Sequence, residues 1–441
     1  MPTASQGIAT TTTAPDTGSN SKVQFTAVAC PFCGLHCDDL DIVATPRGLH
    51  VESNGCARAR AGFERPLPAS QPAIAGRAAT LSDAMSEASR LIAGARQPLF
   101  GGLGVDVEGM RAVMALADKA GGVVDHALSA AQYRNTGVLQ TQGWIMSTLT
   151  EVRNRADLII VVGSDLPALH PRFFDRIAAP GETMFGPSAS DRTVVLLGCG
   201  TDADTVRAAA PRIGKVIDIP VAAETLHSVL GLLRAKLKDA PGATTSDGGD
   251  ARLADLADRC RQAAYGVFVW APQALTFPGA DLVVQTVSDI VRDLNKTTRF
   301  AGLSLGGNDG AQSAASVCSW QTGYPLRVSF ASGAPEYDPY RFDIARILAA
   351  GEGDLLVWFA AIDPALRPPR SDVPTVLIGA PGAEQDFEGT PAVFIPVSTP
   401  GLDHGGRLVR CDSVVSLPLR ALRRSSHPTV PELARALEAQ I

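Results

Sequence analysis

Four cysteines near the N-terminus are the residues of this chain best suited to chemistry. Cys30, Cys33 and Cys37 follow a C-x2-C-x3-C spacing, and residues 38–55 separate them from Cys56. We expect these intervening residues to form a hairpin, with arms over 38–44 and 49–55 and a turn at 45–48. The two arms run in opposite directions and have equal length, at roughly 3.3 Å per residue. The chain therefore returns to where the hairpin began, and Cys56 lies beside Cys37. The spacing therefore predicts four convergent thiolates.

Four thiolates suit two kinds of metal site. They can hold a [4Fe–4S] cluster, or they can hold a structural zinc ion, since C-x2-C pairs also bind zinc. Three cysteines within residues 30–37, together with a fourth returned by a hairpin, favour the iron–sulfur cluster. The basic residues Arg58, Arg60 and Arg65 follow Cys56. They either offset the negative charge of a cluster or form a solvated helix face.

The other four cysteines are scattered along the chain. Cys199, Cys260, Cys318 and Cys411 have no close cysteine neighbour in the sequence. We therefore expect each to be a small buried apolar residue rather than a ligand.

The length and composition of the chain exclude several classes of function. A chain of 441 residues is long enough for two or three domains. Its net charge of -6 offers no basic stripe for nucleic acid, and no apolar run reaches the roughly 18 residues that span a bilayer. The first 22 residues are mostly Thr, Ser, Gly and Ala, without the apolar middle of a signal peptide. We expect a disordered tail and a cytoplasmic protein that binds neither nucleic acid nor membrane.

The elements that must position the cysteines follow a second pattern. From residue 81 onward, helical spacing alternates with short apolar runs such as residues 158–163, which is typical of buried parallel strands. This rhythm predicts an α/β fold with doubly wound parallel sheets in two halves, and ligands at the carboxyl ends of the strands. The expected parts are a tail (1–22), a cysteine-rich hairpin domain (23–66), a first α/β domain (67–237), a linker (238–250), a second α/β domain (251–425) and a C-terminal helix (426–441).

Several long motifs resemble a known family. They are CPFCGLHCDDL (30–40), TLTEVRNRADLIIVVGSDLPALHPRF (148–173), GGNDGAQSAASVCSWQTGYP (306–325), IDPALRPP (362–369) and, more loosely, STPGLDHGGRLVRCD (398–412). With them the chain resembles the B subunit of formylmethanofuran dehydrogenase, a molybdopterin oxidoreductase. In the dehydrogenase this subunit holds a [4Fe–4S] cluster and a tungsten or molybdenum bis-pterin, and it reduces CO2 to formate. The resemblance implies the same scaffold here.

The chain departs from that family at the metal. The position of the family's metal-ligating cysteine falls at Ala131, the neighbouring His is Gln132, and no cysteine lies between Cys56 and Cys199. A methyl group cannot coordinate a metal. Asp165 and Asp309 add carboxylates to turns that would meet the pterin nucleotide. Two negative charges about 4 Å apart repel by roughly 4 kcal/mol at an effective dielectric constant of 20, which weakens binding about a thousandfold.

These departures resemble the form of the family found in methylotrophic bacteria, within the formyltransferase/hydrolase complex. The resemblance then implies a redox-inactive scaffold subunit in tetrahydromethanopterin-linked oxidation of formaldehyde to formate. Its expected partners are the other three subunits of that complex: a zinc hydrolase (the A subunit), a second scaffold (the C subunit) and the formyltransferase (the D subunit). The [4Fe–4S] cluster is expected to be bound and the bis-pterin to be absent.

The resemblance also marks the remaining site residues. We expect no catalytic residue, cluster ligation by Cys30, Cys33, Cys37 and Cys56, and an inherited, vestigial pterin pocket. Two alternatives stay open: an active molybdenum or tungsten dehydrogenase with a non-cysteine ligand, and an electron-transfer module that uses only the cluster. The residues assigned to the vestigial pocket are Gly163, Ser164, His170, Arg172, Gly307, Asn308 and Asp363.

Overall fold

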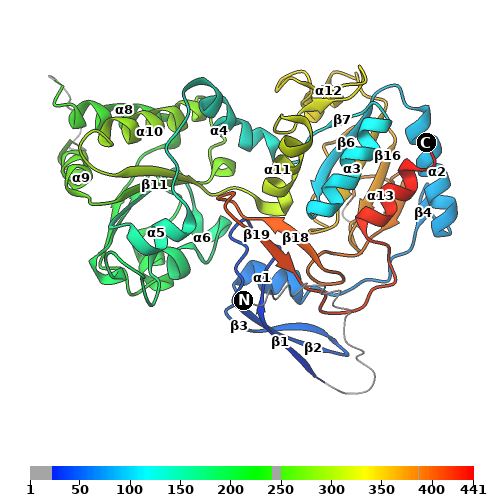
Figure 1. Ribbon diagram of the computed structural model, residues 1–441, viewed down its shortest axis with the longest axis horizontal. Helices are drawn as coiled ribbons and strands as arrows, with labels where there is room; N and C mark the ends of the chain where they lie inside the picture. The colour runs from blue at the N-terminus through cyan, green and yellow to red at the C-terminus, as the bar shows by residue number, and fades with distance from the viewer. Residues whose placement is uncertain (1–21, 241–249, 386) are drawn as a thin grey trace, which may run out of the picture.

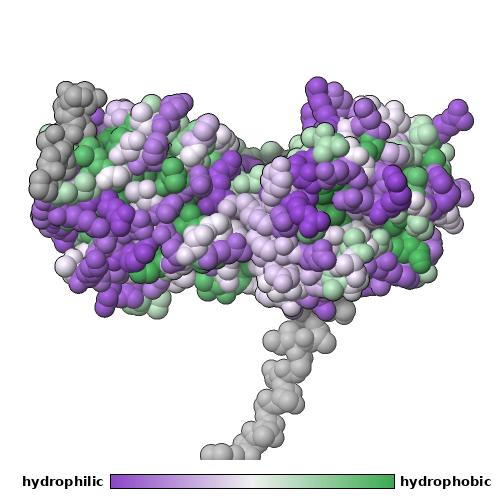
Figure 2. Space-filling model, turned by 90° about the horizontal axis from the view of Figure 1, so that it is seen from above, coloured by the Kyte–Doolittle hydropathy of each residue, from purple (hydrophilic) through white to green (hydrophobic). Residues whose placement is uncertain are grey.

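The computed structural model describes residues 22–240, 250–385 and 387–441. The expected tail (1–22) and linker (238–250) therefore lie almost wholly outside the described residues. Figure 1 shows two α/β lobes side by side, with a small β-sheet beneath their junction. Figure 2 shows the same two lobes from above, with a narrower waist between them.

The small sheet carries the cysteines. Strands β1 (Val23–Val28), β2 (Leu40–Thr45) and β3 (Gly48–Ser53) form an antiparallel sheet in this order. Thr45 pairs with Gly48, so the predicted hairpin exists and its turn is two residues long. Alternate residues of β2 are buried, as expected of a sheet with one covered face. Helix α1 (Ala57–Phe63) begins directly after the hairpin, at Cys56.

The first lobe surrounds a five-stranded parallel sheet in the order β10-β9-β8-β11-β12. Leu158, Ile160 and Val162 of β8 pack with the helices on one face, and Ile159 and Val161 pack on the other. This explains why the sequence run is apolar without alternation. The strands are β8 (Leu158–Val162), β9 (Thr193–Leu197), β10 (Lys215–Ile219), β11 (Gly266–Trp270) and β12 (Phe300–Ser304), and the flanking helices include α5 (Leu149–Arg155), α6 (Leu166–Leu169), α7 (Ala203–Ala209), α8 (Leu226–Leu237), α9 (Asp250–Gln262) and α10 (Ala280–Leu294).

The second lobe surrounds a nine-stranded mixed sheet in the order β14-β13-β7-β6-β15-β16-β17-β4-β5. Its centre, from β7 to β17, is parallel. The strands are β4 (Ala73–Ile74), β5 (Arg77–Ala78), β6 (Pro98–Gly104), β7 (Val123–Val124), β13 (Val328–Ser329), β14 (Glu336–Tyr337), β15 (Leu355–Ala360), β16 (Thr375–Gly379) and β17 (Val393–Pro396), and the helices are α2 (Leu81–Gly94), α3 (Val107–Lys119), α12 (Ile344–Ala349) and α13 (Val430–Glu438).

The sheets do not follow the order of the chain. Strands β11 and β12 come after the expected linker, yet they extend the sheet of β8, β9 and β10. Strands β6 and β7 come early, yet they pair into the sheet of β15, β16 and β17. A boundary at 238–250 therefore does not separate the two lobes. A βα rhythm indicates that strands are parallel, because each crossover needs a helix, but it does not say which sheet each strand joins.

Three elements lie where the lobes meet. They are helix α4 (Ser129–Gln142), helix α11 (Ala311–Thr322) and the hairpin of β18 (Gly406–Val409) and β19 (Ser416–Leu419) (Figure 1). At the chain end, α13 begins with a capping box between Thr429 and Glu432, within the expected C-terminal helix. Within the described ranges, no helix has both the length and the apolar content needed to cross a bilayer.

Candidate cysteine site and interlobe pocket

The four N-terminal cysteines line one small cavity, as the spacing predicted. The loop that holds three of them is closed by two backbone bonds, from Cys30 N to Cys37 O (2.8 Å) and from His36 N to Cys33 O (3.0 Å). Cys56 is the N-cap of α1, and its Sγ accepts a bond from Ala59 N at 3.4 Å. The loop, the hairpin and a helix start together direct the four side chains to one cavity.

Burial keeps the thiols of this cavity in their protonated form. Burial raises the pKa of Cys33 to about 12, with a further rise from Cys37, so a positive metal is needed to hold the thiolates. Zinc requires its four ligands about 2.3 Å from one centre. Among the described residues, no three His, Cys, Asp or Glu side chains are close enough to hold one metal ion.

Arginines from two distant segments surround this cavity. Arg58 and Arg172 line it. Arg172 makes a bidentate pair with Asp39 (2.6 and 2.9 Å), and Arg176 pairs with Asp38 beside it. Burial raises the pKa of Cys37, and Arg176 and Arg172 act against that rise by favouring the thiolate. These two arginines supply positive charge that the residues after Cys56 were expected to supply.

Two of the basic residues predicted to lie near the cluster have other partners. Arg60 donates to the carbonyl of Val51 at 2.7 Å. Arg65 donates to the carbonyl of Ile362 (3.0 Å) and to Thr399 Oγ1 (2.7 Å), and so ties the small sheet to the second lobe. Among the three, only Arg58 lines the cysteine cavity. Of the two roles left open for these arginines, charge balance at the cysteine cavity therefore does not apply to Arg60 and Arg65.

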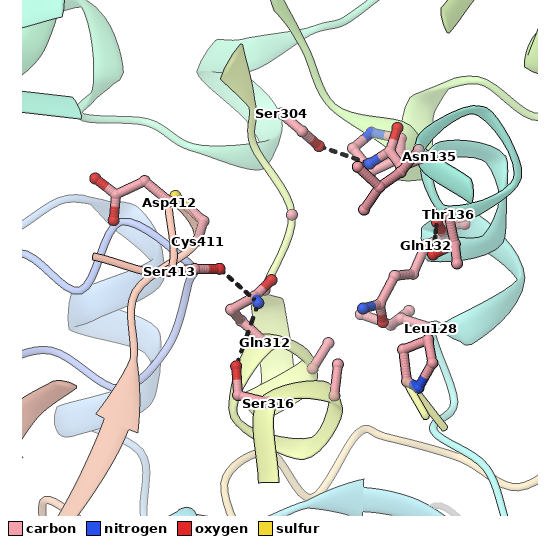
Figure 3. A pocket seen from close by; sticks show the side chains of 18 of the residues that line it. Leu128, Gln132, Asn135, Thr136, Ser304, Gln312, Ser316, Cys411, Asp412 and Ser413 are labelled. Atoms are coloured by element: carbon pink, nitrogen blue, oxygen red, sulfur yellow. Dashed lines mark hydrogen bonds between the residues drawn. The ribbon is translucent and has the colours of Figure 1, made fainter. Parts of the chain in front are cut away.

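A larger pocket of about 550 Å³ opens between the lobes. Its walls are α4, α11, the turn after β18, and the loops that follow β11 and β12 at their carboxyl ends (Figure 3). This is the expected place for a ligand in a parallel sheet. Ala131 and Gln132 both line the pocket. The positions at which the resemblance predicted the loss of a metal-binding cysteine and of its neighbouring histidine therefore both face the interlobe pocket.

The described residues give the pocket a mixed apolar and polar lining without cationic side chains. None of the described residues that line it is Lys, Arg or His. Its one acidic residue, Asp412, is neutralised by a bidentate pair with Arg410 (2.8 and 2.7 Å). Asn135 bonds Ser304 (2.8 Å) and Trp270 (2.9 Å), and Gln312 bonds Ser413 (2.8 Å) (Figure 3). Asn135 and Gln312 are therefore hydrogen-bonded to other polar side chains of the lining.

Cys411 is the cysteine that lines this pocket. Like Cys260 and Cys318 it is buried, as predicted, whereas Cys199 is only partly buried. Cys411 and Asp412 lie in the segment that matched the family most loosely, and that match was the available signal for their position. Nothing in the local sequence indicated that this turn would reach the interlobe pocket.

Side-chain hydrogen bonds to nearby backbone groups hold the turn after β8 in place. Ser164 Oγ donates to the carbonyl of Val162 (2.8 Å) and accepts from Ala271 N (2.9 Å), so it joins β8 to the loop after β11. Gly163 has a φ of 55°, and a Cβ there would lie 2.7 Å from Leu226. Asp165 caps α6 by accepting from Ala168 N at 3.1 Å. Neither Gly163 nor Ser164 lines the interlobe pocket.

The other residues assigned to a pterin pocket lie in several environments. His170 is buried and bonds the carbonyl of Leu305 at 2.9 Å, and burial lowers its pKa to about 4. Arg172 lines the cysteine cavity, and Gly307 lines the interlobe pocket. Asn308 Oδ1 accepts from Gly34 N at 2.9 Å, so it anchors the cysteine loop.

Asp363 lies near Asp309 on the second-lobe side of the junction. Burial, and then the carboxylate of Asp363, raise the pKa of Asp309 to about 6. Of the seven residues expected to share one pocket, only Gly307 lines the interlobe cavity. Of the remaining six, Arg172 lines the cysteine cavity, and the other five lie outside the pocket lining.

Comparison with known proteins shows the family to which the chain belongs. The chain is 33% identical over 338 residues to the B subunit of the formyltransferase/hydrolase complex of Methylorubrum extorquens, an alignment that covers 76% of this chain and 87% of the relative. The chain belongs to this family of formyltransferase/hydrolase complex B subunits. The B subunit of a tungsten-containing formylmethanofuran dehydrogenase of Methanocaldococcus jannaschii is 26% identical over 415 residues, covering 88% and 91% of the two chains. A scan against family models found no match.

Solved structures confirm the fold of this member of the formyltransferase/hydrolase complex family. A chain of the Methylorubrum extorquens complex, crystallised with methylofuran, superposes with a TM-score of 0.70 at 29% identity, covering 84% of this chain and 98% of that one. Acetylene hydratase from Pelobacter acetylenicus superposes with a TM-score of 0.55 at 9% identity, over 95% of this chain and 70% of that one. At this low identity the similarity concerns the fold alone. The predicted α/β architecture with parallel sheets and a small N-terminal domain is confirmed.

Proposed function

We propose that this chain is the B subunit of a formyltransferase/hydrolase complex and that it supports its partner subunits without redox chemistry of its own. Its relative is named as one component of such a complex, which was crystallised with methylofuran. By this similarity the partners are the formyltransferase, the zinc hydrolase and the second scaffold subunit. The pathway is the one-carbon route from formaldehyde to formate.

One observation carries the redox-inactive role. Ala131 lies in the wall of the interlobe pocket, at the position where the dehydrogenase form of the family carries its metal-binding cysteine. The methyl group offers no electron pair to tungsten or molybdenum. Gln132, beside it, replaces the histidine and cannot carry a proton at neutral pH.

The charge of the pocket supports the same conclusion. A bis-pterin dinucleotide carries pyrophosphate groups, which proteins bind with helix N-termini, backbone N–H groups and cations. The described lining residues supply no cation. Asp309 and Asp165 place carboxylates on the adjoining strand-end turns, and Asp165 already occupies the N-cap of α6. The residues present do not fit this cofactor.

The cysteine cavity supports a separate structural cofactor. Cys30, Cys33, Cys37 and Cys56 are the residues that would hold a [4Fe–4S] cluster, with Arg58 and Arg172 beside them to balance its negative charge. Such a cluster would cross-link the loop, the hairpin and α1 at one point. An electron-transfer role would need further clusters nearby, and the described part of the chain offers no second group of closely spaced cysteines.

Metal analysis of the purified complex tests the proposal. The complex is isolated without oxygen, and its tungsten, molybdenum, iron and pterin contents are measured together with formate:dye oxidoreductase activity. We expect about four irons per copy of this chain, no stoichiometric tungsten or molybdenum, and no formate oxidation. Stoichiometric tungsten or molybdenum with formate oxidation would instead establish the active dehydrogenase. Absence of iron, together with one zinc per copy of this chain beyond the zinc of the hydrolase subunit, would establish the zinc alternative.

A further inference from the structure

The interlobe pocket has the size and place of a small-molecule site. Its volume of about 550 Å³ lies within the usual range of roughly 300–1,000 Å³ for ligand pockets. It lies at the carboxyl ends of β11 and β12, bounded by Pro272 and Gln273 after β11 and by Ser304 and Gly306 at and after the end of β12. If no bis-pterin is bound, as proposed above, the family's cofactor does not fill this space.

The side-chain charges around the pocket do not favour an anion. The described lining contains no cationic side chain, and the carboxylate of Asp412 already accepts from Arg410 and from Leu149 N (3.0 Å). An anion that entered would lose its hydration without gaining a charged partner, which is costly in a partly buried site. An uncharged polar molecule avoids this penalty.

One lining residue has a hydrogen-bonding group without a partner. Gln132 Oε1 is buried and accepts no bond within the described chain, and Figure 3 shows its side chain extending from α4 into the cavity. The amides of Asn135 and Gln312 differ, because they are bonded to neighbouring side chains. A buried acceptor without a donor is unfavourable, so a ligand N–H or O–H that meets Oε1 once the side-chain amide turns towards the cavity would remove the cost.

The apolar part of the lining suits a planar molecule. Trp320 lines the pocket from α11, and Trp144 lines it from the segment just after α4. Trp144 is fixed by packing against Trp270, with ring centroids 5.8 Å apart, whereas Trp320 is 64% exposed. Aromatic faces with nearby amides are typical of sites for planar polar rings.

From these observations, and on the basis of the proposed function, we infer that the interlobe pocket binds an uncharged planar molecule that donates a hydrogen bond to Gln132. Gln132 is the residue that determines the specificity of the site. The absence of cations makes the site reject anionic analogues of the same ring.

Matched pairs of neutral and anionic compounds test this inference on the assembled complex. The probes are nicotinamide with nicotinate, and adenosine with adenosine monophosphate. Binding is detected by saturation-transfer NMR and Kd is obtained by titration. We expect at least one neutral compound to bind, and its anionic partner to bind at least about tenfold more weakly. Ala131→Trp, which fills the pocket, should abolish binding.

Gln132→Met decides the role of the amide. It keeps the length of the side chain and removes the acceptor, so Kd of the neutral compound should rise about tenfold, which corresponds to the loss of one partly buried hydrogen bond. The matched control is Gln142→Met, on the same helix but outside the pocket lining, where Kd should not change.

Three results would overturn the inference: no neutral probe binds, an anion binds as tightly as its neutral partner, or Gln132→Met leaves Kd unchanged. Each of them leaves the proposed function intact, because metal content and formate oxidation are measured independently. Conversely, tungsten in the pocket would refute the proposed function before any probe is added.

Discussion

Gly34 is the point at which the cysteine loop depends most strongly on the lobe junction. A Cβ at this residue would lie 1.9 Å from the carbonyl oxygen of Gly306 and 3.1 Å from Cys411 Cβ. Gly34 also donates to Asn308 Oδ1 (2.9 Å) and accepts from Cys411 N (2.9 Å). In the variant Gly34→Ala, the loop must therefore move away from the junction, and both hydrogen bonds are stretched or lost.

The expected loss of stability follows from these contacts. Two hydrogen bonds contribute about 1 kcal/mol each, and forcing a methyl group into a filled site costs roughly 1–3 kcal/mol. We expect the free energy of unfolding to fall by about 4 kcal/mol, and Tm to fall by about 8 °C at a scale of roughly 2 °C per kcal/mol. Iron content should fall as well, because the loop carries three of the four cysteines.

Differential scanning fluorimetry and iron analysis of the purified complex measure both effects. The control is Gly231→Ala in α8, where an added Cβ meets nothing within 4 Å. That substitution should leave Tm unchanged or raise it slightly, since alanine is the better helix former. If Gly34→Ala kept the Tm and the iron content of the wild type, the assignment of a backbone-to-backbone contact at this site would be wrong.

Three further predictions concern other parts of the framework. Burial lowers the pKa of His126 to about 4, from an ordinary value of 6.5. Between these two pH values the unfolded chain binds more protons than the folded chain. The free energy of unfolding should therefore fall as the pH drops from 6.5 towards 4. His126→Gln should flatten that part of a pH series of denaturant titrations, by at most about 3 kcal/mol. Arg192→Met should lower the unfolding free energy by about 3 kcal/mol or more, because it removes five hydrogen bonds that the buried guanidinium donates to the carbonyls of Ala178 (3.0 Å) and four other residues. An unchanged urea midpoint would contradict this. Cys33→Ser should reduce the iron content well below that of Cys260→Ser, in which the mutated cysteine is buried outside the cavity lining, and equal iron contents would argue against a cluster at this site.

The parts of the structure that the sequence predicted are those set by local rules. The hairpin over 40–53 followed from equal arms around a short turn, and the convergence of the four cysteines followed from the hairpin. The buried strands followed from their apolar runs, and the start of α13 is marked by its capping box.

The parts that the sequence did not predict depend on contacts between distant segments. Arg172 and Arg176 reach the cysteine loop from a segment more than 100 residues away, and nothing in their local spacing marks them. Asn308 was assigned to a cofactor pocket, yet its amide oxygen holds Gly34. The polar side chains of Ser164 and His170 are bonded within the framework. A motif shared with a family shows that a residue has a place in the fold, but only the three-dimensional contacts show which one.

The interleaved sheets have a consequence for biosynthesis. Strand β6 ends at Gly104, but β15, its neighbour in the centre of the sheet, begins only at Leu355. On a ribosome that adds roughly 5–20 residues per second, the nascent polypeptide spends on the order of tens of seconds with an unpaired apolar edge at β6. The first lobe likewise lacks β11 and β12 until well past the middle of translation. The edge of β6 is therefore exposed to aggregation until β15 has been synthesised.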